Sequence, residues 1–308
     1  MARIAVTRKL PGTALDRLRA AGHEVDVWPG ELPPPREALL ELVAPADALL
    51  SLLTDRIDAG VLEAAPRLRA IANYAVGSDN IDLGAAAARG IPVGVTPDVL
   101  TDATADLTLA LLLAAARRLL PAVDDVRAGR WRTWDPNGWL GLELRGATLA
   151  VVGTGRIGTA VAERARAFGM RVEPVGRGDD LHAALTRADV VSLHVPLTEA
   201  TRHLIDAGAL AAMKPTAILI NTARGAIVDQ AALVAALRDG TIAAAAVDVT
   251  DPEPPDPGDP LLALPNALVV PHIGSATQST RARMADLAAD NLLAALAGRP
   301  MPHPAAQR

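Results

Sequence analysis

The amino-acid sequence predicts an α/β protein with two parallel-sheet domains, and three observations support this fold class. Short runs rich in β-branched residues alternate with amphipathic segments along most of the chain, which is typical of βαβ units. A G-x-G-x-x-G fingerprint at residues 153–158 follows one such run and precedes a helical pattern. The length of 308 residues suits two domains of ordinary size, each able to bury its own core.

The N-terminal third predicts the first sheet. A long helical pattern follows it at residues 101–120, with Thr101 or Asp102 as N-cap and Pro121 closing it. We interpret this helix as a bridge between the domains. The expected strands of the first sheet are 4–7, 25–28, 48–53, 68–73 and 92–95, and its helices are 14–21, 36–43, 60–65 and 83–89.

The rest of the chain predicts a second sheet, with a fingerprint at its first turn. This arrangement indicates the doubly wound order, in which ligands bind at the carboxyl ends of the strands. A final amphipathic helix at 278–298 is expected to return to the first domain. We therefore predict one domain from residues 1–98, completed by 277–308, and a second from 99–276, with no internal repeat. The strands expected in the second sheet are 147–152, 171–175, 190–194, 217–221, 243–249 and 267–270, and the helices between them include 159–168 and 181–187.

Composition excludes several classes of function. The chain has no cysteine, which rules out disulfides, a thiol nucleophile and cysteine-ligated metals. A formal net charge of −5 without a basic run argues against a nucleic-acid-binding surface. The longest uncharged apolar stretch, residues 107–116, is well short of the ~20 residues that span a bilayer, and the N-terminus lacks an apolar signal core. We expect a cytoplasmic protein with no metal and no nucleic-acid or membrane partner.

The fingerprint predicts a dinucleotide-binding turn. Gly153 permits the tight turn out of the strand, Gly155 lets the backbone approach a pyrophosphate, and Gly158 lets the helix pack on the sheet. Arg156 and Ile157 complete the motif, and the amide groups at the start of the helix face the phosphates. A glycine triplet can arise by chance in a chain with 24 glycines, so the strand before it and the helix after it carry the prediction.

Three polar side chains lie where strands of the second sheet are expected to end, namely Arg224, Glu253 and His272. The planar guanidinium of arginine matches a carboxylate in two-point contact, so Arg224 is a natural anchor for an acidic substrate. Histidine exchanges a proton near neutral pH, and a carboxylate beside it favours the imidazolium and sets its tautomer. Together the three groups suit proton donation to a carbonyl oxygen.

Each of these residues also has a simpler interpretation. Arg224 could form a surface ion pair with Asp229, and Glu253 could belong to a solvated, proline-rich loop. His194 also lies at a strand end and competes with His272 for the role of acid. No single residue distinguishes these alternatives.

Four segments in order resemble the D-isomer-specific 2-hydroxyacid dehydrogenase family: GTGRIG at 153–158, NTARGAIVD at 221–229, DVTDPEP at 248–254 and PHIGSAT at 271–277. The resemblance extends over essentially the whole chain, including residues 73–82 and 96–104. It is strongest to glyoxylate/hydroxypyruvate reductases, through the VLTDATAD segment, the loop with Trp131 and Trp134, and the HIGSAT segment. It implies a Rossmann dinucleotide-binding domain and a flavodoxin-like substrate domain.

The resemblance also implies roles for individual residues. Arg224 would hold the substrate carboxylate and keto oxygen, His272 would donate the proton, and Glu253 would be its partner. The backbone amides of Val76 and Gly77 would grip the carboxylate from the first domain.

Further residues would line the substrate pocket or the cofactor site. Leu53 would lie in the pocket beside the two amides. Asp248 would meet the nicotinamide carboxamide, for which a helix cap or loop hydrogen bond is the alternative. Thr104 would lie near the cofactor phosphate, and Thr222 would also contact the cofactor.

The end of the second strand of this sheet bears on cofactor choice. Acceptors of the NAD ribose hydroxyls are usually acidic residues at this position, where the chain has Gly176. Arg177 could supply a countercharge to a 2′-phosphate, so we favour NADP(H) over NAD(H). In the alternative, Arg177 stacks on adenine and Asp179 or Asp180 binds the ribose. The segment before helix 181–187 is short, which leaves open whether a strand found in relatives is missing.

We therefore predict an oxidoreductase that uses NAD(P)H to reduce small 2-keto acids such as glyoxylate or hydroxypyruvate to D-2-hydroxy acids. The alternatives are a D-lactate- or phosphonate-type dehydrogenase of the same family, or a non-catalytic, dinucleotide-sensing protein of the corepressor kind. The resemblance further implies a homodimer formed through the nucleotide-binding domain. Trp134 would either reach the neighbouring subunit's site or pack locally.

Overall fold

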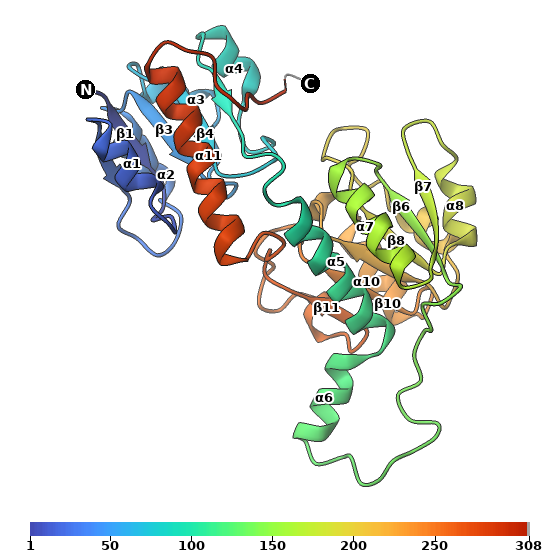
Figure 1. The fold of residues 1–308 in the computed structure, drawn as a ribbon. Helices are drawn as coiled ribbons and strands as arrows, with labels where there is room; N and C mark the ends of the chain where they lie inside the picture. Colours follow the sequence, from blue (N-terminus) through green and yellow to red (C-terminus); the bar gives the residue numbers. More distant parts are fainter. Residues whose placement is uncertain (307–308) are drawn as a thin grey trace. The chain divides into compact units, whose positions relative to one another are not determined.

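The computed structural model describes residues 1–306, which divide into two compact units (Figure 1). The first unit contains Met1–Leu100 and the chain from Ala276 onward, and the second contains Thr101–Ser275. Each unit has a parallel sheet with an apolar core on both faces, which confirms the predicted α/β class. Within residues 1–306, no helix combines the length and the apolar character that crossing a bilayer requires.

The first sheet has five parallel strands in the order β2-β1-β3-β4-β5. Its central strands β3 and β4 are buried along their whole length. β3 ends before residue 53 because the chain turns there, and Asp55 accepts a hydrogen bond from the Leu52 amide. The elements are β1 (Arg3–Val6), α1 (Ala14–Ala20), β2 (Glu24–Val27), α2 (Arg36–Val43), β3 (Ala48–Ser51), α3 (Ala59–Ala64), β4 (Ala70–Asn73), α4 (Leu83–Ala88) and β5 (Val93–Gly94).

The C-terminal helix α11 (Gln278–Leu296) belongs to the first unit and lies along its sheet (Figure 1). Its apolar face, including Met284 and Leu292, is buried in the same cluster as Ile4 of β1. Asn291 is fully buried on this helix, and its side chain donates to the Val95 carbonyl and accepts from the His303 amide, both at 2.9 Å. The chain therefore returns to complete the core of the first unit.

The second sheet has six parallel strands in the order β11-β10-β9-β8-β6-β7, so β7 is an edge strand. The strand order reverses at β6, whose neighbours β7 and β8 lie on opposite sides of it, and that is where open α/β sheets bind ligands. The elements are α5 (Thr101–Ala116), α6 (Leu119–Arg127), β6 (Thr148–Val152), α7 (Arg156–Ala167), β7 (Arg171–Val175), α8 (Leu181–Arg187), β8 (Val190–Leu193), α9 (Ala207–Ala212), β9 (Ile218–Asn221), η1 (Gly225–Ile227), α10 (Gln230–Arg238), β10 (Ala244–Val247), η2 (Pro260–Ala263) and β11 (Ala267–Val269).

The helix after the first sheet differs from its prediction in two respects. Helix α5 is an integral part of the second unit, because it buries Leu109 and Leu112 in a hydrophobic cluster that it shares with α7. Our interpretation of this helix as a bridge between the domains was wrong. The helix also ends at Ala116, and Arg118 takes a left-handed conformation with φ 50°. Pro121 does not close α5 but lies in the first turn of α6, where a missing amide hydrogen has no consequence.

The helix of the fingerprint begins earlier than expected. α7 starts at Arg156 with Gly155 as its N-cap, whereas the sequence predicted a start at residue 159. The first three helical residues are therefore part of the glycine motif. This overlap brings the helix N-terminus directly to the turn that follows β6.

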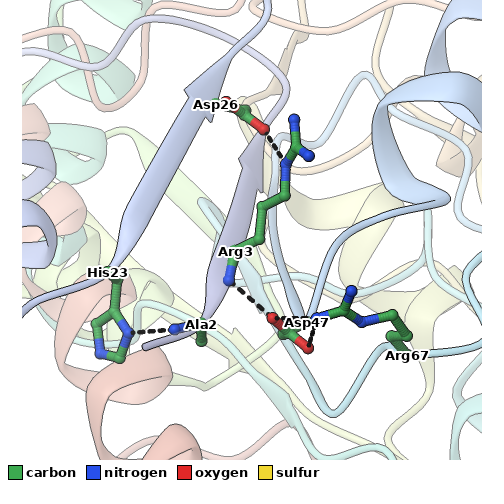
Figure 2. Close-up of polar contacts among 6 residues, drawn as sticks. All are labelled: Ala2, Arg3, His23, Asp26, Asp47 and Arg67. Carbon is green, nitrogen blue, oxygen red and sulfur yellow. Dashed lines mark hydrogen bonds and ion pairs between the residues drawn. The ribbon is translucent and has the colours of Figure 1, made fainter.

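In both sheets, an aspartate just before a strand makes the same kind of contacts, which is a structural correspondence that the sequence did not reveal. Both sheets place the first strand between the second and the third. Asp47, just before β3, accepts from the Arg3 amide at 2.8 Å and pairs with Arg67 at 3.1 Å (Figure 2). Asp189, just before β8, likewise accepts from the Thr148 amide at 2.8 Å and pairs with Lys214 at 2.7 Å. Each aspartate thus satisfies the leading amide of the neighbouring strand.

Replacing Asp47 by alanine is expected to lower the free energy of unfolding by about 2 kcal/mol, because the Arg3 amide loses its partner. Burial raises the pKa of Asp47, but the Arg3 amide and Arg67 outweigh burial and hold it below its usual value. The charge therefore stabilises the fold above the ordinary aspartate pKa of about 4, and this contribution is lost as the pH falls below it.

Chemical denaturation of the wild type, Asp47→Ala and Asp47→Asn between pH 7 and pH 2 checks this expectation. The asparagine keeps an acceptor but not the charge, so its stability should depend less on pH below 4. Asp16→Asn is the control, since that carboxylate is 77% exposed. Equal acid sensitivity of all four proteins would contradict the assignment.

Candidate active site

The three glycines of the fingerprint have different surroundings, which explain why each position has no side chain. Gly153 has φ +101°, and a Cβ atom there would lie 2.6 Å from the carbonyl carbon of His194 at the end of β8. A Cβ at Gly158 would lie 2.0 Å from the Gly153 carbonyl oxygen. At Gly155, by contrast, a Cβ would meet no atom of the described chain within 4 Å. Gly153 and Gly158 are thus required by the protein backbone, while Gly155 leaves open space beside the turn.

The N-terminus of α7 is suited to a phosphate group. Gly155 is the N-cap of α7 and makes no side-chain cap hydrogen bond, and Arg156 and Ile157 begin the first turn of the helix. This helix of 12 residues begins beside the open space at Gly155, and the N-terminus of a helix favours an anion. The turn therefore fits the pyrophosphate of a dinucleotide.

The loop after β7 has one carboxylate at the strand end, although the strand itself ends without one. The Gly176 amide donates to Asp179 Oδ2 at 2.7 Å, and that oxygen lies 3.4 Å from where a Cβ of Gly176 would be. Asp180 is the N-cap of α8 and accepts from the Ala183 amide at 2.9 Å. Arg177 is exposed.

Two of the predicted chemical groups are in direct contact. The Nδ1 atom of His272 lies 2.5 Å from Glu253 Oε1, although 19 residues separate them. An ionised carboxylate only accepts hydrogen bonds, so Nδ1 carries the proton of this pair. The Nε2 atom is then the nitrogen that remains for a substrate oxygen. The side chains of His272 and Glu253 are 26% and 32% exposed.

Asp248 fixes the backbone around His272. Its carbonyl oxygen accepts from the His272 amide, and its two carboxylate oxygens accept from the amides of Ile273 at 2.6 Å and Gly274 at 2.8 Å. His272 has φ 51°, a left-handed conformation that needs such support. Burial raises the pKa of Asp248, an effect opposed by the amides and by His272.

The contact of Asp248 that the structure shows is therefore a loop hydrogen bond, the alternative to binding the nicotinamide carboxamide. Sequence reasoning missed this role of Asp248 toward His272. No helical or strand periodicity relates Asp248 to His272 along the chain, so no local sequence pattern could have indicated this contact. Each carboxylate oxygen retains a second lone pair that can accept from a ligand.

Hydroxyl groups connect α5 to two strand-end loops of the second sheet. Thr104 donates to the Gly274 carbonyl at 3.3 Å, next to the His272 turn. Thr108, which sequence reasoning missed, donates to the Thr104 carbonyl and lies 3.0 Å from the Thr222 hydroxyl. The helical spacing of Thr104 and Thr108 was the signal that could have identified it.

The Arg224 loop packs against the loop that precedes Glu253. A Cβ at Gly225 would lie 1.9 Å from the Thr250 carbonyl oxygen, so the two backbones are in contact there. The Arg224 guanidinium donates to the Ala223 carbonyl at 2.8 Å. Asp229, the alternative partner for this arginine, caps α10 and accepts from the Ala232 amide at 3.0 Å.

His194 does not compete with His272 as an acid. Burial lowers the pKa of His194 to about 4, and its Nε2 atom is 2.8 Å from the Ser192 hydroxyl. His194 is therefore neutral at physiological pH and has no proton to donate as an imidazolium.

The first unit contributes two loops at the carboxyl ends of its strands. Leu53 follows β3, while Val76 and Gly77 follow β4. Val76 is 40% exposed. Within residues 1–306, no hydrogen bond from the amides of Val76 and Gly77 to the chain is found, and the Gly77 carbonyl accepts from the Asn73 side chain.

Comparisons with known proteins show the family of this chain. Residues 109–274 match the family described as D-isomer specific 2-hydroxyacid dehydrogenase, NAD binding domain. A glyoxylate reductase of Korarchaeum cryptofilum is 50% identical over 306 residues, covering 95% of this chain and 92% of the relative. A glyoxylate reductase of Aeropyrum pernix is also 50% identical, covering 98% of this chain and 95% of the relative.

Solved structures show the same fold. A protein from Thermus thermophilus is 55% identical with a TM-score of 0.94, covering 99% of this chain and 100% of that one. An NADPH-dependent glyoxylate/hydroxypyruvate reductase from Sinorhizobium meliloti, solved with NADP and malonate, is 35% identical with a TM-score of 0.86 and coverage of 99% and 97%. The second unit is thus the nicotinamide-dinucleotide-binding domain of an oxidoreductase. The chain belongs to the D-isomer specific 2-hydroxyacid dehydrogenase family.

Proposed function

We propose that this protein reduces small 2-keto acids, with glyoxylate and hydroxypyruvate as preferred substrates, to 2-hydroxy acids of D configuration where a stereocentre forms. The contact of His272 with Glu253 carries the proposal, because it provides a held proton donor in the domain that has the dinucleotide turn. The names of the curated relatives, which are about half identical over nearly the whole chain, point to the same substrate.

The charge of each proposed site residue determines its role in the reaction. Arg224 binds the substrate carboxylate and keto oxygen, and the amides of Val76 and Gly77 add donors to the carboxylate. The reduced nicotinamide, when bound, supplies the hydride that reaches the keto carbon. His272 then gives the proton on Nε2 to the developing alkoxide, and Glu253 stabilises the imidazolium that makes this proton available.

Other residues hold the site in place. Asp248 keeps the His272 turn in its left-handed conformation and retains lone pairs for the carboxamide of the cofactor. Thr104 and Thr222 line the cofactor side, and Leu53 lines the substrate pocket beside the two amides.

Steady-state assays of glyoxylate, hydroxypyruvate and pyruvate, each with NADPH and NADH, test the proposal. We expect kcat/KM for glyoxylate and hydroxypyruvate to exceed that for pyruvate, and chiral analysis should find D-glycerate from hydroxypyruvate. A protein that binds the cofactor but turns over none of these acids would instead be a dinucleotide sensor. Pyruvate or a phosphorus oxyanion as the best substrate would favour the lactate- or phosphonate-type alternatives.

We further propose that NADP(H) is the favoured cofactor, with NAD(H) also accepted. Gly176 leaves the end of β7 without the usual carboxylate, and the exposed Arg177 can meet a 2′-phosphate. The neighbouring Asp179 opposes this preference, since its carboxylate already lies at the Gly176 amide. The two side chains should therefore shift selectivity in opposite directions.

The ratio of kcat/KM for NADPH to that for NADH measures this selectivity. Arg177→Ala should lower the ratio about tenfold to hundredfold, the range expected for losing a charged hydrogen bond. Asp179→Ala should raise it, because a negative charge near the 2′-phosphate is removed. A strong NADH preference of the wild type that Arg177→Ala leaves unchanged would overturn the proposal.

We also propose that the protein is a homodimer formed through the second unit. The arm made of α6 and the following loop, residues 118–140, projects from the rest of that unit (Figure 1), and α6 has no buried residue. Trp134 on this arm is 77% exposed, so it does not pack locally. Apolar side chains this exposed favour cover by another surface, for which a second copy is the partner we propose. The exposed apolar residues of the arm are Leu119, Leu120, Val123, Val126, Trp131, Trp134, Trp139 and Leu140.

Light scattering coupled to size exclusion should give twice the chain mass of 31.8 kDa. Val126→Asp should shift the protein toward the monomer, because a charge would enter the interface. Leu32→Asp is the matched control, since Leu32 is 77% exposed in the first unit. A monomeric wild type, or equal effects of the two variants, would contradict the proposed interface.

A further inference from the structure

Two loops of the first unit carry the groups proposed to meet the substrate. One follows β3 and contains Leu53, and the other follows β4 and contains Val76 and Gly77. Loops are usually the most mobile part of a sheet edge, yet a substrate carboxylate must find two amides in fixed positions. Other residues must therefore hold these two loops in one geometry.

Asn80 connects the second loop to the first. Its side-chain nitrogen donates to the Leu52 carbonyl at 2.9 Å and to the Asp55 carbonyl at 3.0 Å. Its own backbone carbonyl accepts from the Ile57 amide at 2.9 Å. One residue thus contacts the first loop on both sides of Leu53, at three backbone groups.

Asn73 extends this connection to the loop that contains Val76 and Gly77. It is fully buried at the end of β4, and its side-chain nitrogen donates to the Gly77 carbonyl and to Asn80 Oδ1, both at 2.9 Å. Its side-chain oxygen accepts from the Ser51 hydroxyl at 3.1 Å. The carbonyl of Gly77 is therefore linked through Asn73 and Asn80 to the carbonyl of Leu52.

The side chain of Asp55 also holds the first loop in place. This carboxylate is 4% exposed and accepts from the Leu52 amide at 2.7 Å and from the Thr7 hydroxyl at 2.5 Å. Burial raises the pKa of Asp55, which the two donors and Arg8 oppose. Leu52 is consequently held at its amide by Asp55 and at its carbonyl by Asn80.

We propose that Asn73 and Asn80 form an amide clamp that sets the positions of Val76, Gly77 and Leu53, which makes Asn80 a positioning residue for the substrate. The inference rests on the proposed function for its catalytic consequence only. The clamp itself touches no substrate atom. Its effect is to present the two amides already oriented, so that binding does not have to order them.

Hydrogen–deuterium exchange tests the clamp independently of any activity. Asn80→Ala should raise exchange about tenfold or more in peptides covering both 52–56 and 74–79, because both loops lose a shared partner. Asn80→Asp has the same shape but cannot donate to the two carbonyls, and it should act in the same way. Asn266→Ala is the matched control, since that side chain also donates to two carbonyls, at 3.0 and 3.1 Å, but in the second unit.

Kinetics test the consequence for the substrate. Both Asn80 variants should lower kcat/KM for glyoxylate about 10- to 100-fold and weaken inhibition by oxalate, a substrate-sized dicarboxylate, by a similar factor. The dissociation constant of NADPH should change less than twofold, as it should for Asn266→Ala. A general loss of stability would weaken cofactor and oxalate binding together, so the difference between the two ligands identifies positioning.

The possible outcomes separate the two proposals. Faster exchange in only one loop, or in neither, overturns the clamp whatever the activity. Faster exchange in both loops with unchanged oxalate and glyoxylate constants overturns its role toward the substrate. If the wild type reduces no 2-keto acid, the proposed function fails, while the exchange experiment still decides whether the clamp exists.

Discussion

Replacing His272 by alanine is expected to lower kcat for 2-keto acid reduction about 10²–10⁴-fold, the range for removing a positioned general acid. The substrate and cofactor sites otherwise persist, so the dissociation constant of NADPH should change little. The reason is local: Glu253 holds Nδ1 at 2.5 Å and Asp248 holds the backbone, leaving Nε2 as the proton donor. Single-turnover rates and cofactor titrations measure the two quantities separately.

His203→Ala is a matched control for this variant, because His203 also has φ 51° and lies outside the proposed machinery. Both substitutions remove a histidine from a left-handed conformation, so any shared change in melting temperature reflects the backbone. Glu253→Gln keeps an acceptor for Nδ1 but removes the charge that stabilises the imidazolium, and its kcat for reduction should be lower than that of the wild type. Activity of His272→Ala within threefold of the wild type would exclude it as the acid.

The second large effect is expected at the fingerprint, where two glycines respond differently to alanine. Gly155→Ala should leave stability nearly unchanged, because a Cβ there meets no atom of the described residues within 4 Å. The new methyl group would enter the space for the pyrophosphate, so NADPH should bind about 10- to 100-fold more weakly. Gly158→Ala should instead destabilise the fold by about 3 kcal/mol, since its Cβ would lie 2.0 Å from the Gly153 carbonyl oxygen.

Isothermal titration and denaturant unfolding of both variants distinguish ligand space from backbone packing. Gly258→Ala is a useful reference, because a Cβ at Gly258 meets no atom of the described residues within 4 Å and its φ is not left-handed, so it reports the effect of an added methyl group alone. Unchanged NADPH affinity in Gly155→Ala would mean that the dinucleotide does not approach this turn. Equal stability of Gly158→Ala and the wild type would mean that the helix can shift away from the sheet.

Elements with local signals were predicted well. β7 and α8 have the bounds that the sequence indicated, because a β-branched run and the capping residue Asp180 define them over a few residues. Pro121 misled the prediction for the opposite reason. A proline ends a helix in its interior but is tolerated in the first turn of the next one, and the local sequence does not show which case applies.

The site residues show the same difference between features with a local sequence signal and features without one. Residue types, together with the family resemblance of the ordered motifs, were sufficient to indicate the glycine turn and the pairing of Glu253 with His272. The backbone hold of Asp248 on the His272 turn, and the links of Asn73 and Asn80 to Gly77 and Leu52, depend on parallel strands ending at one edge of a sheet. Folding brings such partners together although no periodicity relates them along the sequence. The chemistry can therefore be predicted from the sequence, while the groups that position it are identified only in the tertiary structure.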